Sequence, residues 1–162
     1  MPVIYLNANT AVGWASSVAN VNAPTAGECN GAIRLETLMP SDGLAIGITN
    51  NKTPTGNLGT IFDLERIATI GAAVKLKFHH DTLADTAWNL LPFRTLGFLI
   101  VRRGIARATT FTTGQGGGGA NGTIMVLPLE SGYADEIDPP NNWDFELDFA
   151  MYAEPGLRAV VA

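Results

Sequence analysis

Residues 143–152 read Trp-Asp-Phe-Glu-Leu-Asp-Phe-Ala-Met-Tyr, the most regular pattern in the chain. Apolar side chains occupy the odd-numbered positions, and most of the even-numbered positions are acidic. An alternation of period two places the two sets of side chains on opposite faces of a β-strand. The stretch therefore predicts a strand with one face in a core. Its other face carries Asp144, Glu146 and Asp148, spaced roughly 6–7 Å apart.

Further strands are expected on both sides of this stretch. Residues 33–37 and 74–78 alternate in the same way, and Lys75 and Lys77 lie on the exposed face of the second. The continuous apolar run 96–101 indicates a strand that is covered on both faces. Shorter apolar runs bounded by turn residues predict the remaining strands, at 3–6, 44–48, 123–130 and 157–161.

One helix is expected, over residues 81–91. An Asp or Thr at its start is a suitable N-cap, an acidic residue lies in its first turn, and Pro92 ends it. Its apolar positions lie along one side: Leu83, Ala87, Leu90 and Leu91.

About seven or eight strands and one helix, without a regular strand–helix alternation, predict a mainly β fold. We expect a β-sandwich or barrel with one short flanking α-helix. The length of 162 residues suits a single domain. Within it, residues 32–162 are the expected core and residues 1–31 an extended N-terminal arm.

The arm is expected because residues 7–31 are mostly small and polar and can bury little surface. Trp14 lies within it like an anchor that docks on another surface. Two Gly- and Asn-rich segments, 50–59 and 114–122, are expected to be long flexible loops.

Charged residues make up only 15% of the chain, which suggests that neighbouring subunits cover part of its surface. The net charge of −5 argues against binding of a nucleic-acid backbone. The charge is also divided unevenly. From residue 130 onward there are eight acids and one base, hence −7, whereas the remainder has seven acids and nine bases, hence +2. Such polarity favours head-to-tail stacking, although a plain solvated acidic face is an equal alternative.

No catalytic, metal or cofactor site is expected. The GxGxxG pattern at 114–119 precedes a strand instead of a helix, so it lacks the context of a dinucleotide site. His79 and His80 are adjacent and point to opposite faces of a strand. Cys29 is the only cysteine and is expected to be a small buried residue. Neither a membrane helix nor a signal peptide is indicated.

Two segments resemble a known family. Residues 22–30 read Asn-Ala-Pro-Thr-Ala-Gly-Glu-Cys-Asn and precede an expected strand. Residues 95–104 read Thr-Leu-Gly-Phe-Leu-Ile-Val-Arg-Arg-Gly and follow Asp85-Thr86-Ala87-Trp88. Both are similar to segments of the major tail tube proteins of long-tailed (siphovirus-type) actinobacterial phages. Cys29 departs from the family's pattern, in which that position is apolar.

The resemblance implies a structural virion protein, not an enzyme. Its subunits would form hexameric rings that stack into a tube around a tape measure protein, bounded by tail terminator and tail tip proteins. Double-stranded DNA would pass through the lumen during genome ejection without specific binding. Assembly would take place in the host cytoplasm, with no membrane partner.

The resemblance also suggests roles for particular residues. Because the family's lumen is usually acidic, the face with Asp144, Glu146 and Asp148 is the candidate lumen lining. Lys75 and Lys77 are either rival lumen residues or cross-strand partners of these acids. Candidate contacts between subunits lie in the arm and the loops: Trp14, Asn22, Pro24, Thr25, Pro54, Gly116 and Gly118.

Two other classes of function remain open. A head–tail joining or capsid decoration protein would also be β-rich and poor in charge, but it would form closed rings or trimers. A small β-barrel that binds a ligand would be a monomer or small oligomer with an apolar pocket.

Overall fold

The computed structural model describes residues 8–56, 59, 65–137 and 143–162. These residues form an antiparallel sheet of eight strands in the order β2-β1-β5-β6-β7-β4-β3, with β8 paired to β6. The strands are β1 (Thr10–Ala15), β2 (Ile33–Arg34), β3 (Leu44–Pro54), β4 (Glu65–His79), β5 (Leu96–Arg103), β6 (Thr123–Ile137), β7 (Asp144–Met151) and β8 (Gly156–Ala159).

The helical elements are short: α1 (Ala26–Gly31), α2 (Thr86–Leu90) and the 3₁₀ helix η2 (Gly119–Asn121). The prediction of a mainly β chain with seven or eight strands is confirmed. The strand expected at 3–6 lies outside the described residues.

The sheet is covered on both faces in its central part. One hydrophobic cluster lies on the face that α2 covers, and it includes Trp14, Phe78, Leu127 and Phe145. The other lies on the opposite face of β1, β5 and β6, beneath α1, the segment 104–115 and the C-terminus; it includes Ile100, Val126 and Cys29. The continuous apolar run of β5 follows from this double burial, as its sequence predicts.

Strands β4 and β7 have one buried face and one solvated face. Phe78, Phe145 and Leu147 belong to the first cluster. The register pairs Lys75 with Asp148 and Lys77 with Glu146. Directly paired residues project to the same side of a sheet, so these four charged side chains share the solvated face, as the alternation in the sequence predicts.

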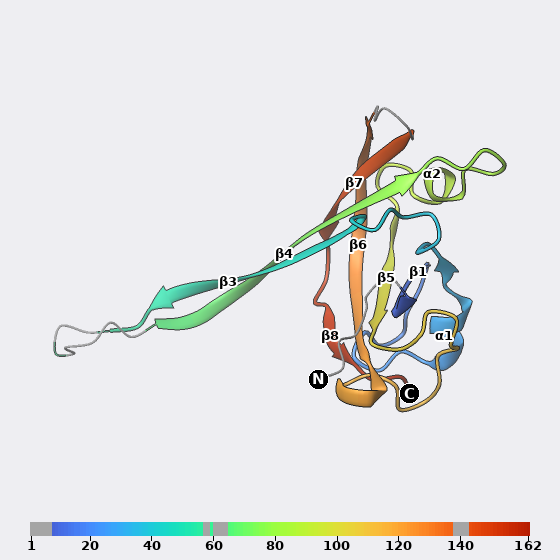
Figure 1. Cartoon of the computed structure of the whole chain (residues 1–162). Helices are drawn as coiled ribbons and strands as arrows, with labels where there is room; N and C mark the ends of the chain where they lie inside the picture. The colour runs from blue at the N-terminus through green and yellow to red at the C-terminus, as the bar shows by residue number, and fades with distance from the viewer. Residues whose placement is uncertain (1–7, 57–58, 60–64, 138–142) are drawn as a thin grey trace.

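The hairpin of β3 and β4 is much longer than expected. Its strands pair from Leu44 with Leu76 out to Pro54 with Glu65, and its outer half projects far from the body (Figure 1). The prediction that a loop begins at residue 50 is therefore wrong for residues 50–54. Asn, Lys and Pro are uncommon in strands, so local preference does not predict one here; residues 50–54 are a strand because they pair with β4.

The N-terminal segment is part of the core. Thr10–Ala15 pairs with β5 over its whole length, and only 3% of the surface of Trp14 is exposed. The indole also lies 5.8 Å, between ring centroids, from Phe149. The predicted boundary between an arm at 1–31 and a core at 32–162 is thus wrong for residues 10–15. Local composition could not show that β5 offers an edge to this segment.

The helix at 81–91 is shorter than predicted. Asp85 adopts a left-handed conformation with φ of 45°, so α2 begins only at Thr86. The Asp85 carboxylate instead accepts a hydrogen bond from the Asp81 amide and bonds the His80 ring. Leu83 is consequently 95% exposed, whereas Ala87 and Leu91 pack in the core as predicted.

The Gly-rich segment is folded, contrary to the prediction of a flexible loop. Gly116 forms an isolated bridge with Val160, and η2 closes the segment ahead of β6. A Cβ at Gly116 would lie 2.1 Å from the Ala159 carbonyl oxygen, and its φ of 112° also favours glycine. The glycines here permit a tight fold against the C-terminal strand.

Candidate functional site

The solvated face of β4 and β7 carries a ladder of charge pairs. The Nζ of Lys75 lies 2.6 Å from Oε1 of Glu146 and 3.6 Å from Oδ1 of Asp148. The hydrogen bond to Glu146 and the two negative charges raise the pKa of Lys75. The Nζ of Lys77 lies 3.9 Å from carboxylate oxygens of both Asp42 and Asp144. Lys75 and Lys77 are therefore cross-strand partners of the acids, one of the two alternatives left open by the sequence.

The prediction that Asp144, Glu146 and Asp148 form a row of exposed acids is wrong for Asp144. Only 4% of its surface is exposed, and its carboxylate bonds the Nδ1 atom of His79. It is buried because it lies opposite His79 in the register, at the end of β4. Glu146 and Asp148 remain accessible, and Asp135 lies directly opposite Glu146 on β6.

The resulting face is mixed in sign with an acidic excess. Among the described residues, two lysines lie close to four carboxylates, and a fifth carboxylate lies opposite Glu146; the five are Asp42, Asp135, Asp144, Glu146 and Asp148. Such a face repels a polyanion weakly and offers it no row of uncompensated cations.

The outer half of the β3–β4 hairpin has an apolar face of its own. Ile70 pairs with Asn50 and Ile67 pairs with Lys52, with Ala68 as the extra residue of a β-bulge. Since Asn50 and Lys52 are two apart, their partners project to the same side. The bulge thereby brings Ile67 and Ile70, three residues apart in sequence, onto one face.

This apolar face continues the core face of the sheet. Val74 and Leu76 are buried in the first cluster, and the same register leads outward through Ile48 and Ala72 to Ile70. Beyond the body nothing among the described residues covers it: Ile67 is 61% exposed and Ile70 is 60% exposed. We refer to Ile48, Ile67, Ile70 and Ala72 as the apolar hairpin face. Pro54 lies at the far end of the same hairpin.

The other predicted contact residues lie close to their own chain. Thr25 is the N-cap of α1, in a capping box with Glu28. The carbonyl oxygens of Asn22 and Pro24 accept hydrogen bonds from the amides of Val160 and Ala162. The amide of Gly118 donates a hydrogen bond to the carbonyl oxygen of Gly122 in the folded segment before β6. Trp14 and Gly116, which the sequence suggests as contacts between subunits, are buried against their own chain.

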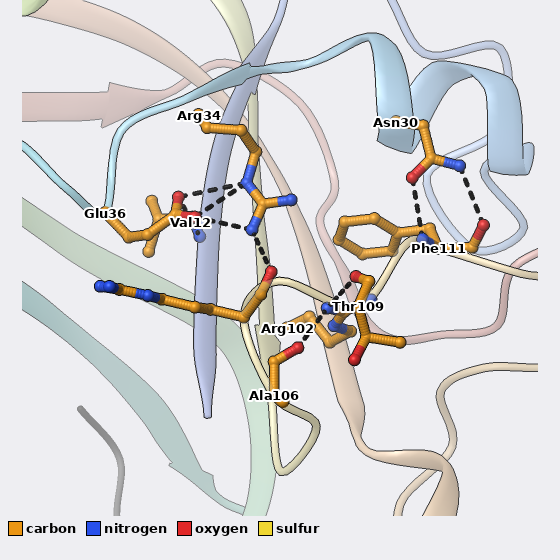
Figure 2. Close-up of polar contacts among 9 residues, drawn as sticks. Val12, Asn30, Arg34, Glu36, Arg102, Ala106, Thr109 and Phe111 are labelled. Carbon is orange, nitrogen blue, oxygen red and sulfur yellow. Dashed lines mark hydrogen bonds and ion pairs between the residues drawn. The ribbon is translucent and has the colours of Figure 1, made fainter. Parts of the chain in front are cut away.

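Arg102 organises the segment after β5, a role that sequence reasoning missed. Its guanidinium is fully buried and donates to the carbonyls of Ala106 and Thr109, at 3.1 and 2.6 Å (Figure 2). It also lies over the Phe111 ring, 4.2 Å from the centroid. Burial lowers the pKa of Arg102. The available signal was an arginine two residues after Ile100, and hence on the same face, in a strand predicted to be covered on both faces.

The side chains of Arg34 and Asn30 also fix this region (Figure 2). Arg34 forms an ion pair with Glu36 at 2.6 Å and donates to the Arg107 carbonyl at 2.7 Å. The side-chain amide of Asn30 exchanges two hydrogen bonds with the backbone of Phe111. Arg102, Arg34 and Asn30 thus hold the segment 104–115 against the body.

Cys29 is buried as predicted, and burial raises the pKa of its thiol to about 11. Histidine, cysteine and carboxylate side chains nowhere gather in threes in a way that could bind a metal ion, as far as the described ranges extend. None of the described helices has the length and apolarity needed to cross a membrane.

The comparisons with known proteins agree with the resemblance noted in the sequence. Residues 1–117 match the model of a family described as phage tail tube protein. The match covers most of the chain and includes the hairpin of β3 and β4, whereas β6, β7 and β8 follow it. The comparison with curated proteins gives no match.

Proposed function

We propose, from the premise that the chain belongs to the phage tail tube protein family, that its copies form hexameric rings which stack into the tail tube. The tube would be the conduit for phage DNA during genome ejection. The resemblance of residues 22–30 and 95–104 supports a long-tailed phage of an actinobacterial host. A structural tail protein, part of the virion, is the function that the family establishes.

The observation that carries the proposal is the uncovered apolar hairpin face. An isolated two-stranded hairpin is marginally stable in water at best, and this one extends a hydrophobic face beyond its body. Contiguous exposed apolar surface on a projecting element marks a site of association. A second copy of the chain is the partner that is present in large number in a tube. The second copy would present its own apolar hairpin face and its own edge strand β3 as the complementary surface.

The solvated face of β4 and β7 is the proposed lumen lining. Glu146, Asp148, Lys75 and Lys77 lie there, and their pairing with an acidic excess would let DNA slide past without specific binding. Asp144 would contribute to the field of this face from a buried position. The hairpin and this face belong to the same sheet, so association through the hairpin would extend the face from subunit to subunit.

The proposed partners follow from assembly. A tape measure protein would occupy the lumen before DNA, and tail terminator and tail tip proteins would contact the two ends of the tube. Assembly in the host cytoplasm is part of the proposal.

Negative-stain electron microscopy of the purified full chain tests the proposal. Wild-type protein is expected to form hollow tubes or stacked six-fold rings, and the double variant I67N/I70N is expected to stay monomeric while remaining folded. Thr53→Asn, on the opposite face of the same hairpin, is the matched control and should assemble normally.

Closed trimers or single rings that never stack would favour a head–tail joining or decoration protein instead. A wild-type monomer at every concentration that also fails to add to isolated tail tips would overturn the tube.

A further inference from the structure

A cavity of about 320 Å³ opens beside the end of β5. Thr10 and Val12 of β1 line one side, and Arg103 and Arg107 lie at its basic end. The wall is completed by Leu44 at the start of β3 and by four residues of the segment between β2 and β3: Glu36, Met39, Pro40 and Ser41.

The two arginines in this wall have no acidic partner among the described residues. The one acid of the wall, Glu36, already binds Arg34 through both carboxylate oxygens and accepts the Val12 amide. Arg103 and Arg107 form no ion pair in the described ranges. An arginine fork matches a carboxylate in geometry and charge, so the cavity is suited to a carboxylate from outside the chain.

The backbone that carries Arg107 is fixed in place. Its amide donates to the Ala8 carbonyl at 3.0 Å, and its carbonyl accepts from Arg34 at 2.7 Å. The Gly104 amide donates to the Asn9 carbonyl at 2.9 Å. Little backbone freedom is therefore left to be lost on binding, which favours affinity.

The complementary charge lies at the other end of the molecule. Asp135 and Glu136 are exposed near the end of β6 and form no ion pair among the described residues. Arg103 pairs with Thr123, the first residue of β6. Asp135 is twelve residues further along this strand, which is about 40 Å at the usual rise per residue. The basic cavity and these acids cannot meet within one chain, because β6 separates them along the body (Figure 1).

We infer that the cavity at Arg103 and Arg107 binds the Asp135–Glu136 segment of the next copy, so that successive copies stack head to tail. The inference rests on the proposed function and specifies a contact between copies that is distinct from the hairpin. A contact between opposite ends of identical chains does not close on itself and repeats without limit. Stacking of this kind displaces successive copies by about 40 Å along β6.

Charge reversal tests the contact. R103E/R107E and D135K/E136K are each expected to raise the concentration needed for assembly at least tenfold, because two like-charged groups would meet. Arg158→Glu is the control for reversing the charge of an arginine outside the cavity: Arg158 is exposed on β8, and its reversal should leave assembly unchanged. Circular dichroism and thermal unfolding establish that each variant is folded.

Mixing the two double variants gives the decisive result. Each variant repels itself, whereas the reversed cavity of one complements the reversed acids of the other. An equimolar mixture should recover assembly in alternating copies, and high salt should weaken it. Two folded variants that fail to associate when mixed, or an R103E/R107E variant that assembles like wild type, would overturn the inference.

Sedimentation velocity separates this inference from the proposed function. It detects pairwise association of the mixed variants even where no tube forms, so failure of the tube and failure of the cavity contact give different results. Carboxylate competition is measured on the wild-type protein, in which every cavity keeps its arginines. If added acetate or succinate dissociates wild-type assemblies only as readily as sodium chloride does at equal ionic strength, the contact is general screening and no carboxylate site exists.

Discussion

The body and the projecting hairpin contain similar apolar side chains in opposite circumstances. Ile100 on β5 is 1% exposed within the second cluster, whereas Ile70 on β4 keeps most of its surface in solvent. In the body each apolar side chain contributes to the folding of one chain. An apolar side chain on the hairpin adds little to the stability of the single chain, because most of its surface stays in water until another surface covers it. A single sheet thus holds both a folding core and a surface for association.

The largest effect is expected from the body. Phe145→Ala removes a fully buried ring that contacts Phe78 and Trp88, so unfolding should become easier by about 3–5 kcal/mol. Chemical denaturation of the monomer measures this. A change below about 1 kcal/mol would show that the sheet does not depend on this face.

Arg102→Met is expected to cost about 2–4 kcal/mol, because the buried carbonyls of Ala106 and Thr109 lose their donor. Hydrogen exchange should accelerate over residues 104–115 first. Arg103→Met, the next residue on the same strand, is the control and should change stability by less than about 0.5 kcal/mol. Equal losses in both variants would contradict the role given to Arg102.

A smaller effect concerns pH. The amides of Thr25 and Ala19 donate to Glu28 and lower the pKa of its carboxyl in the folded state. A lowered pKa means that the ionised form stabilises the fold. That contribution is complete above the carboxyl pKa of the unfolded chain and is lost as pH falls through the lower folded value. Glu28→Gln should therefore flatten the acid side of a plot of stability against pH, and an unchanged acid slope would contradict this.

The smallest effect on stability is expected on the hairpin, and it tests directly whether the hairpin differs from the body. Ile70→Ser should change the free energy of unfolding of the monomer by less than about 0.5 kcal/mol. Ile100→Ser, the same substitution in the body, should cost several times more, because it leaves a buried hydroxyl in a cavity. If Ile70→Ser unfolded the monomer as strongly as Ile100→Ser does, the hairpin would belong to the core and would be no association surface.

Much of the sheet could be predicted from local pattern. The alternation at 143–152 and 74–78 correctly predicted which side chains lie in the core and which lie on the solvated face. Such alternation arises because successive side chains of a half-buried strand point to opposite faces. The core residues are Phe145, Leu147 and Phe78, and the solvated ones are Lys75 and Lys77. The run at 96–101 indicated double coverage for the same reason. Cys29 was correctly expected to be buried.

Tertiary structure alone decided the rest. Residues 10–15 and 50–54 carry weak strand patterns and become strands because β5 and β4 offer partners distant in sequence. The Gly-rich segment at 114–122 is folded because the C-terminal strand lies against it, and only glycine tolerates that approach. Asp144 loses its exposure because the register sets it opposite His79. Local composition indicates which secondary structure a segment prefers. Strand pairing, burial and register depend instead on which distant segment packs beside it. Only the folded chain could therefore separate its core from the hairpin face and the basic cavity.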